Sequence, residues 1–395
     1  MSHKIINDPV HGFIQISYDL AQQCIDHPYF QRLRNISQLG LTHFVYPGAH
    51  HSRFHHALGA FHLMQVALEN LKNKGVVISQ EEEEAASIAI LLHDIGHGPY
   101  SHALEKTFFK RVSHEQISIE LMHRLNNEMK GRLTLAIRMF TNQYERPFFY
   151  QLISSQLDVD RLDYLKRDSF YSGVVEGNIG VDRILAMIDV RDNQIVVHEK
   201  GIMSVQHFLL SRNLMYWQVY LHKTVMSAEH MLVHLFQRIK QLHQTGKGIQ
   251  THNKHLQYFF ERSESEQDLT DEVIGHFIAI DDSDVWQLVK ELRSHPDPIL
   301  SLLSGNILTR NFYKVGTSAP QSLKNLDRFH YLTDSEKKYI QFHERVKMTA
   351  YSSENPIWIL TKTGDIIAYE TYAQNSGFII SLPNTTQKEF YYTLL

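Results

Sequence analysis

The hydrophobic positions in the first two thirds of the chain recur mostly at helical spacing. Over residues 54–73, apolar side chains lie three and four positions apart, and the pattern stops just before Gly75, a residue type favoured after a helix end. Ser79 and Glu82 have the spacing of a capping box, which predicts that a second helix begins there. The acidic run 81–84 would lie in its first turn, where the helix dipole favours negative charge.

This second helix is apolar along most of its length and ends in polar residues. The apolar run leads to His93 and Asp94, and glycines follow at positions 96 and 98. A buried helix that ends in a histidine and an aspartate presents polar groups from a rigid base. We therefore expect a functional site at this point.

Other patterns complete a mainly helical body. Ser113 and Gln116 form another capping box, and alternation after Asp192 and Asn193 predicts a small β-hairpin. Residues 244–253 are polar and are typical of a connection. Further helical patterns cover 156–168, 203–242, 271–280 and 283–292.

The last part of the chain has a different pattern. Short strands are predicted at 358–360, 366–369 and 378–380, with a turn at 363–365. The predicted architecture is mainly α, with a small inserted β-hairpin and a smaller α+β C-terminal part. We expect a helical domain over residues 1–295, with its core motif at 50–170, and a C-terminal region 296–395 that packs on it and takes part in oligomerisation.

Composition narrows the class of protein. The 395 residues are 43% hydrophobic, which is enough for a full core, and 39 basic against 43 acidic side chains give a net charge of −4. That balance argues against a protein that coats nucleic acid or a membrane. Cys24 is the single cysteine, so no intramolecular disulfide can form. With no signal pattern and no apolar run of about 18 residues, we expect a soluble cytoplasmic protein.

The chain contains 26 histidines, and some of them gather with aspartates in predicted buried helices. A site of two or three imidazoles and two carboxylates suits Fe, Mn, Zn, Ni or Co better than Mg or Ca. Taken singly, each histidine could equally be a satisfied polar group near the core. The residues concerned are His55, His56, His93, Asp94, His97, His102, Asp158 and Asp160.

In combination these residues resemble the H…HD…D pattern of the HD-domain metal-dependent phosphohydrolases, with His56, His93, Asp94 and Asp160 in its positions. More narrowly, the chain resembles the deoxynucleoside triphosphate (dNTP) triphosphohydrolase branch, which includes the dGTPases and the animal sterile-alpha-motif/HD-domain enzyme. Weaker likeness continues at 212–223 and 310–314. The matching strings are IINDPVHG (5–12), FQRLRNISQLG (30–40), YPGAHHSRFHHALG (46–59), LLHDIGHGPYSHALE (91–105), SHEQ (113–116) and LDVDRLDYLKRD (157–168).

The resemblance implies that His56, His93, Asp94 and Asp160 bind a divalent transition metal, with Mg as a possible further ion. It also implies catalytic residues beside the α-phosphate of a substrate.

These catalytic residues are His97 and His114, with His114 as the candidate general acid for the departing 5′-oxygen. A nearby carboxylate, Glu105, would tune it, although the branch often has aspartate at that position. The predicted position of His114 works against this role. The dipole at a helix N-terminus favours the neutral form of a histidine, whereas a general acid has to carry a proton.

A triphosphate needs convergent cationic groups, and Arg suits bidentate phosphate contact. By resemblance, Arg53, Arg212 and Lys223 hold phosphates, and Tyr220 excludes a 2′-hydroxyl. Each of these charged residues could instead belong to a solvated helix face. The other expected substrate contacts are Gln38, Leu39, His102, Asp158, Arg161, Tyr164 and Asp168.

The resemblance further implies regulation by a dNTP or GTP bound between the subunits of a dimer or tetramer. From the residues alone, Asp26 could be a helix cap and Arg34 a surface charge. The residues that match the family's regulatory positions are Lys4, Asn7, Asp26, Gln31, Arg34, Arg310 and Lys314.

The leading hypothesis is metal-dependent hydrolysis of dNTPs to a deoxynucleoside and inorganic triphosphate. One alternative is a phosphohydrolase that acts on nucleoside monophosphates or cyclic nucleotides. Another is a nucleotide-sensing oligomer without catalytic activity.

Overall fold

The computed structural model describes residues 4–262, 269–318, 328–349, 351–376 and 385–395, apart from the side chain of His102. The helices are α1 (Asp19–Asp26), α2 (Pro28–Gln31), α3 (Arg53–Asn73), α4 (Gln80–Leu91), α5 (Ser101–Phe108), α6 (His114–Glu128), α7 (Thr134–Phe140), α8 (Phe148–Ile153), α9 (Val159–Ser172), α10 (Val181–Met187), α11 (Ile202–Met215), α12 (Lys223–Gln244), α13 (Lys254–Glu261), α14 (Asp271–Ile278), α15 (Asp282–Leu292), α16 (Pro298–Leu308), α17 (Asp334–Lys337) and α18 (Tyr369–Ser376). The strands are β1 (Lys4–Asp8), β2 (Gly12–Ile16), β3 (Ile188–Arg191), β4 (Gln194–His198), β5 (Lys314–Gly316), β6 (Gln341–Met348), β7 (Trp358–Leu360), β8 (Ile366–Ala368) and β9 (Thr386–Thr393). The predicted mainly α fold is confirmed.

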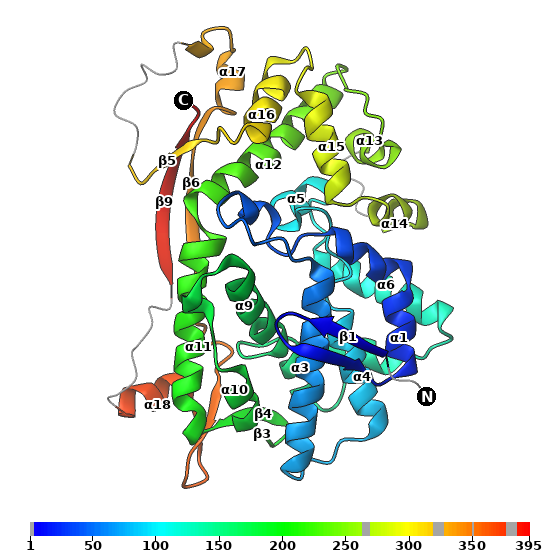
Figure 1. Cartoon of the computed structure of the whole chain (residues 1–395), viewed down its shortest axis with the longest axis vertical. Helices are drawn as coiled ribbons and strands as arrows, with labels where there is room; N and C mark the ends of the chain where they lie inside the picture. The colour runs from blue at the N-terminus through cyan, green and yellow to red at the C-terminus, as the bar shows by residue number, and fades with distance from the viewer. Residues whose placement is uncertain (1–3, 263–268, 319–327, 350, 377–384) are drawn as a thin grey trace.

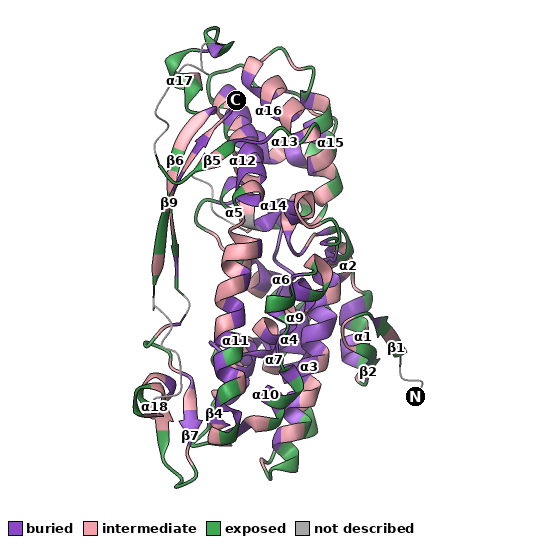
Figure 2. Cartoon of the chain, turned by 60° about the vertical axis from the view of Figure 1, so that its left-hand side comes forward, coloured by how far each residue is buried: buried purple, intermediate pink, exposed green. Residues whose placement is uncertain are grey.

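Helices α3, α4 and α9 form the centre of the helical body, where α3 packs on both of the others. Buried residues make up much of α3 and α4, as the colouring of Figure 2 shows. The close approach of α3 and α9 depends on Gly59, because a Cβ at that position would lie 1.9 Å from Asp163 Oδ1. The glycine thus brings the first turns of α3 next to the acidic face of α9.

The strands form three small sheets (Figure 1). β1 and β2 make an antiparallel hairpin, β5, β9 and β6 make an antiparallel sheet, and the third sheet has the order β3, β4, β7, β8. The predicted hairpin at Asp192 and Asn193 is present, with positive φ angles at both residues. C-terminal β7 pairs in parallel with β4, so a strand from the C-terminal region completes a sheet of the helical body. The division of the chain at residue 295 stays a prediction.

Several predicted boundaries differ from the structure. The helix expected over 156–168 begins at Val159, because the Asp158 side chain accepts a hydrogen bond from the Arg161 backbone N–H and caps the helix. The segment expected over 203–242 is two helices, α11 and α12, separated by a π-helical turn at 216–220. α14 and α15 confirm the two helices expected near 271–292.

The helix α16 was not predicted. The string around Pro296 and Pro298 suggests a break, yet Pro298 lies in the first turn of α16, where a missing N–H costs nothing, and Asp297 caps the helix.

The expected strands at 358–360 and 366–369 correspond to β7 and β8, with Tyr369 already in α18. The strand expected at 378–380 lies outside the described residues. No helix among the described residues is long and apolar enough to cross a membrane.

Candidate functional site

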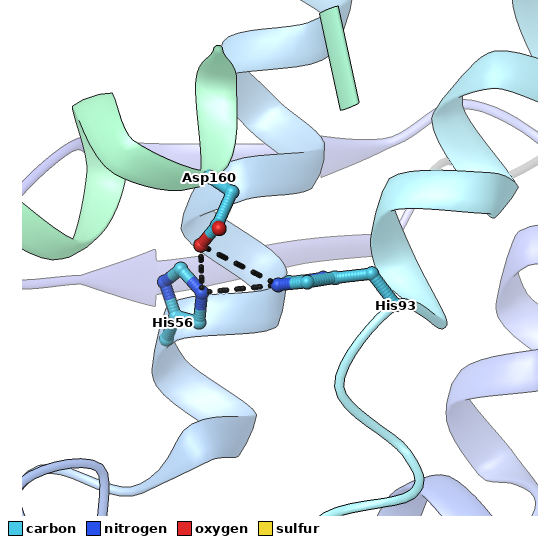
Figure 3. Close-up of side chains that lie close together, drawn as sticks. All are labelled: His56, His93 and Asp160. Atoms are coloured by element: carbon cyan, nitrogen blue, oxygen red, sulfur yellow. Dashed lines mark hydrogen bonds and ion pairs between the residues drawn. The ribbon is translucent and has the colours of Figure 1, made fainter. Parts of the chain in front are cut away.

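His56, His93 and Asp160 converge from three segments of the helical core (Figure 3). His56 lies in the first turns of α3, His93 follows the end of α4, and Asp160 lies in the first turn of α9. The two Nε2 atoms are 3.3 Å apart, and Asp160 Oδ1 is 3.0 Å from His56 Nε2 and 3.5 Å from His93 Nε2. These three side chains form a group that could hold a metal ion.

The orientation of both imidazoles suits a metal. His93 Nδ1 donates a hydrogen bond of 2.6 Å to the carbonyl of Ile90, and His56 Nδ1 donates one of 2.8 Å to Asp163. Each ring therefore keeps its Nε2 for the centre of the group. Two imidazole nitrogens and a carboxylate are a donor set that transition metals favour.

Electrostatics at the group favour a positive charge between its members. Burial alone would lower the pKa of His56, but the carboxylates of Asp160 and Asp163 outweigh burial and raise it to about 10. Burial would raise the pKa of Asp160, and hydrogen bonds from His56 and His93 lower it instead. The carboxylates thus stabilise positive charge where the Nε2 atoms meet.

Asp94, the fourth expected ligand, lies beside this group. Its Oδ1 is 3.3 Å from His93 Nε2 and 3.2 Å from His97 Nε2. Its Oδ2 accepts a hydrogen bond of 2.6 Å from Arg53, which also donates to the Ser101 hydroxyl. Asp94 therefore joins the metal-binding group to a buried arginine.

His97, His114 and Glu105 form a second cluster next to Asp94. The ring of His97 stacks on that of His114, and Glu105 Oε1 accepts hydrogen bonds from both the Nδ1 (2.9 Å) and the backbone N–H (2.7 Å) of His114. The hydrogen bond from His114 lowers the pKa of Glu105 to about 2, so this carboxylate is ionised at neutral pH. Burial and the charge of Arg53 hold the pKa of His97 well below its usual value, so its imidazole is neutral.

A cavity of about 430 Å³ connects these groups, which is within the usual size range of ligand sites. It brings together many of the residues that the sequence singled out, and it adds Thr42, Tyr216, Leu221 and Glu229. The expected site residues that line it are Gln38, Leu39, Arg53, His56, Asp94, His97, His114, Asp160, Tyr164, Asp168 and Tyr220.

Among the described residues, four expected substrate contacts lie outside the lining of this cavity. Asp158 caps α9, and its Oδ2 pairs with Arg161 Nε at 3.1 Å. The guanidinium of Arg212 lies 5.8 Å from the ring centre of Tyr216, and Lys223 is exposed at the start of α12. The side chain of His102 is outside the described part. The roles of all five in substrate binding stay predictions.

Tyr220 has a fixed position at the wall of the cavity. Its hydroxyl donates a hydrogen bond of 2.7 Å to Asp168 Oδ2, and His51 Nε2 donates one of 2.7 Å to Asp168 Oδ1. Tyr216 and Tyr220 are the ends of the π-helical turn, whose extra residue rotates side chains away from ordinary helical spacing. Sequence reasoning missed the role of His51, although the residue lies in the matching string at 46–59.

Glu229 is a second residue that sequence reasoning missed. It lies on α12, lines the cavity, and approaches Gly40, where a Cβ would be 3.5 Å from Glu229 Oε1. Burial, with a smaller effect of the charge of Glu344, raises the pKa of Glu229 to about 7. An acidic residue within an amphipathic helix is normally exposed to solvent, so the sequence pattern around Glu229 does not indicate that it lines a cavity.

The expected regulatory residues form two separate sets in one chain. Lys4 pairs with Asp26 at 3.3 Å, Arg34 donates to Gln31 at 2.8 Å, and Asn7 lies on β1. Arg310 donates to the Phe44 carbonyl at 3.1 Å, and Lys314 lies on β5. Figure 1 shows β1 and β5 on opposite sides of the molecule.

Comparison with known proteins gives the family. The HD domain matches residues 53–168, and an HD-associated region matches residues 179–251. A crystal structure of a phosphohydrolase from Bacteroides thetaiotaomicron VPI-5482 is 43% identical, with a TM-score of 0.93 and a match that covers 100% of both chains. The protein YwfO of Bacillus subtilis is 33% identical over 318 residues, which are 79% of this chain and 71% of that protein.

A further relative is the deoxynucleoside triphosphate triphosphohydrolase SAMHD1 homolog of Dictyostelium discoideum. It is 34% identical over 254 residues, which are 60% of this chain and 49% of that protein. The chain therefore spans about half the length of this relative. The resemblance recognised in the sequence is confirmed, and the chain belongs to the HD-domain phosphohydrolase family.

Proposed function

We propose that this protein hydrolyses dNTPs to deoxynucleosides and inorganic triphosphate with a bound divalent metal. The observation that carries the proposal is one cavity lined by three kinds of group: His56 and Asp160 of the metal-binding group, the His114 ring held by Glu105, and Tyr220, whose hydroxyl is held by Asp168. The relatives that are named for this activity support it.

In this proposal His56, His93, Asp94 and Asp160 hold an Fe, Mn, Zn, Ni or Co ion, and Mg is a further ion that could accompany it. Such an ion supplies acidification of a water molecule and polarisation of a phosphoryl oxygen. Arg53, which is buried beside the group, is placed to contact a phosphate oxygen.

His114 is the proposed general acid. The oxygen of a water molecule bonds to the α-phosphorus, the bond between phosphorus and the 5′-oxygen breaks, and the proton on His114 Nε2 passes to that 5′-oxygen. The water releases one proton to solvent, which balances the proton that His114 takes up again. Nδ1 donates to Glu105, so the carboxylate supports the imidazolium form that can give up a proton at Nε2. His114 is the first residue of α6, where the helix dipole disfavours a positive charge. The negative charge of Glu105 opposes this effect of the dipole.

Tyr220 and Tyr164 are proposed to surround the deoxyribose. Their rings lie 6.3 Å apart, edge to face, and the hydrogen bond to Asp168 holds the Tyr220 ring in place. A ring fixed against the sugar leaves no room for a 2′-hydroxyl. We also propose a homo-oligomer activated by a dNTP or GTP, on the grounds of the residue types at the two regulatory sets. A cytoplasmic location is proposed on a separate ground, the presence of a single cysteine.

One observation favours a second candidate, a phosphohydrolase of nucleoside monophosphates or cyclic nucleotides. Among the described residues, Arg53 is the one Arg or Lys that lines the cavity, and it is already paired with Asp94. A triphosphate needs more cationic contacts than this, whereas a monophosphate does not.

The test is to incubate the purified chain with each dNTP and rNTP, and with nucleoside monophosphates and cyclic nucleotides, in the presence of Mn²⁺, Mg²⁺ or Fe²⁺. The products are separated by ion-exchange chromatography. The Asp94→Ala variant is the control. Deoxynucleoside and intact triphosphate, absent with the variant, are the expected result. In ¹⁸O-labelled water the label should enter the triphosphate, because the attack is on phosphorus. Turnover of monophosphates or cyclic nucleotides alone would favour the second candidate, and no turnover at all would contradict both.

A further inference from the structure

The turn of the N-terminal hairpin is joined to the metal-binding group by buried charged side chains. This turn, residues 8–12, belongs to the string IINDPVHG, and it does not line the cavity. Asp8 and His11 from the turn, Arg167 and Asp163 from α9, and His56 from α3 form one connected network. The proposed reaction gives this string no role.

Asp163 is the centre of the network and is fully buried, with 0% exposure. Its Oδ2 accepts hydrogen bonds from His56 Nδ1 (2.8 Å) and Arg167 Nε (2.9 Å). Its Oδ1 accepts from His11 Nε2 (2.7 Å) and Arg167 Nη2 (3.0 Å). A carboxylate has about four acceptor positions, so the donors around Asp163 use all of them.

Arg167 extends the network to the turn. It donates to both carboxylate oxygens of Asp8, at 2.7 and 3.2 Å, and is itself fully buried. Asp8 Oδ1 also accepts the backbone N–H groups of Val10 and His11, at 3.0 and 2.9 Å. The same arginine and aspartate therefore fix both the turn and the carboxylate of Asp163.

The packing leaves little freedom for Asp163 to move. α3 passes so close that a Cβ at Gly59 would lie 1.9 Å from Asp163 Oδ1 and 2.2 Å from Arg167 Nη2. Because Asp163 is held in place and can only accept a hydrogen bond, it favours the form of His56 that carries hydrogen on Nδ1. In the neutral imidazole that binds a metal, a hydrogen on Nδ1, donated to Asp163, leaves the lone pair on Nε2, and Nε2 faces His93 and Asp160.

We propose that Asp163 is the positioning residue for His56, and that the turn 8–12, through His11, Asp8 and Arg167, sets the affinity of the site for a divalent metal. The proposal rests on the metal site of the proposed function, and it gives the N-terminal hairpin a part in it. Loss of such a partner of a metal-binding histidine typically costs 10- to 100-fold in metal affinity.

The experiment is calorimetric titration of the metal-free full chain with Mn²⁺ and with Zn²⁺, which needs no turnover. Asp163→Asn is nearly isosteric, and its amide can donate to His56 Nδ1, which would shift the histidine hydrogen to Nε2. We expect affinity about 10- to 100-fold weaker for this variant. His11→Ala removes one donor but keeps the carboxylate, and we expect a smaller loss of about 3- to 10-fold.

Asp297→Asn is the matched control, because Asp297 is also a carboxylate that is paired with a buried arginine, Arg238, and it is itself half-buried. It should lower the melting temperature as the network variants do but leave metal affinity unchanged. Unchanged affinity in Asp163→Asn, or an equal loss in the control, would overturn the proposal. If Asp163→Asn does not fold, unchanged affinity in His11→Ala would overturn it.

The result is separable from the proposed function. A chain that binds metal with the expected ranking of variants but cleaves no nucleotide would support this inference and contradict the dNTPase proposal. A wild-type chain that binds neither ion would contradict this inference.

Discussion

The imidazole rings of His97 and His114 stack with their centres 3.9 Å apart and an angle of 17° between their planes. Each ring has its own partner, because His97 Nδ1 lies 2.8 Å from the Ser101 hydroxyl and His114 Nδ1 donates to Glu105. Burial keeps His97 neutral, whereas Glu105 is ionised and can support a charge on His114. The two adjacent histidines are therefore suited to different tasks.

The first prediction concerns this division. Glu105→Gln should lower kcat about 10- to 100-fold with KM changed less than about threefold, because the charge that supports the proposed general acid is lost. Steady-state kinetics between pH 5 and 9 would check it.

Glu105→Asp is the control, since it keeps the charge on a shorter side chain and should restore part of kcat. A Gln variant with the kcat and pH profile of the wild type would remove Glu105 from the mechanism. The pKa of Glu105 is about 2, so no titration of this carboxylate itself should appear in that pH range.

The second prediction concerns Tyr220 and the choice of sugar. Tyr220→Ala should open space beside the sugar and lower the ratio of kcat/KM for dNTP over rNTP about tenfold or more. Tyr220→Phe keeps the ring and loses only the hydrogen bond to Asp168, so it should retain most of the discrimination. Competition assays with paired dNTP and rNTP would measure both ratios. Equal discrimination by the Ala variant and the wild type would show that another group excludes the ribose.

The third prediction uses the titration of Glu229. Its folded pKa of about 7 is above the ordinary value of 4.5, so the folded state binds more protons than the unfolded state between these values. The contribution of Glu229 to the free energy of unfolding should therefore fall as the pH rises from about 4.5 to 7, by about 1–3 kcal/mol. Urea denaturation of the wild type and Glu229→Gln at pH 5 and pH 8 would check it.

The quantity to compare is the difference in the free energy of unfolding between the wild type and Glu229→Gln. Other titrating groups, including the His230 and Glu344 pair, are common to both proteins and cancel in this difference. The Gln variant should gain stability relative to the wild type at pH 8. A difference that does not change with pH would contradict the raised pKa. Glu354→Gln, at an exposed position, is the control and should show no such change.

Local signals explain which parts of the fold the sequence predicted well. The capping boxes at Ser79 and Ser113 and the turn at Asp192 and Asn193 depend on neighbouring residues only, and the structure has all three. The helix α16 was missed because Pro298 is a helix breaker in the interior but is tolerated in a first turn.

The site shows the same limit of local signals. The order of the motifs pointed to His56, His93 and Asp160, which the structure brings together. Glu229 and His51 reach the cavity or its wall through packing between distant segments, for which a single sequence has no pattern. The π-helical turn displaces Tyr216 and Tyr220 from the spacing of 3.6 residues on which helix prediction depends.

The last prediction tests the close contact of α3 and α9. A Cβ at Gly59 would lie 1.9 Å from Asp163 Oδ1 and 2.2 Å from Arg167 Nη2, so Gly59→Ala must displace a buried ion pair. Overpacking costs about 1–3 kcal/mol, and a disturbed buried pair adds to this, so we expect a loss of about 3 kcal/mol or more. Denaturant unfolding would measure the loss. Gly275→Ala is the control, because nothing lies within 4 Å of a Cβ at that helical position, and it should stabilise the protein by about 0.5–1 kcal/mol. Equal stability of Gly59→Ala and wild type would show that α3 and α9 can separate without cost, and the rigid support inferred for His56 would then be untenable.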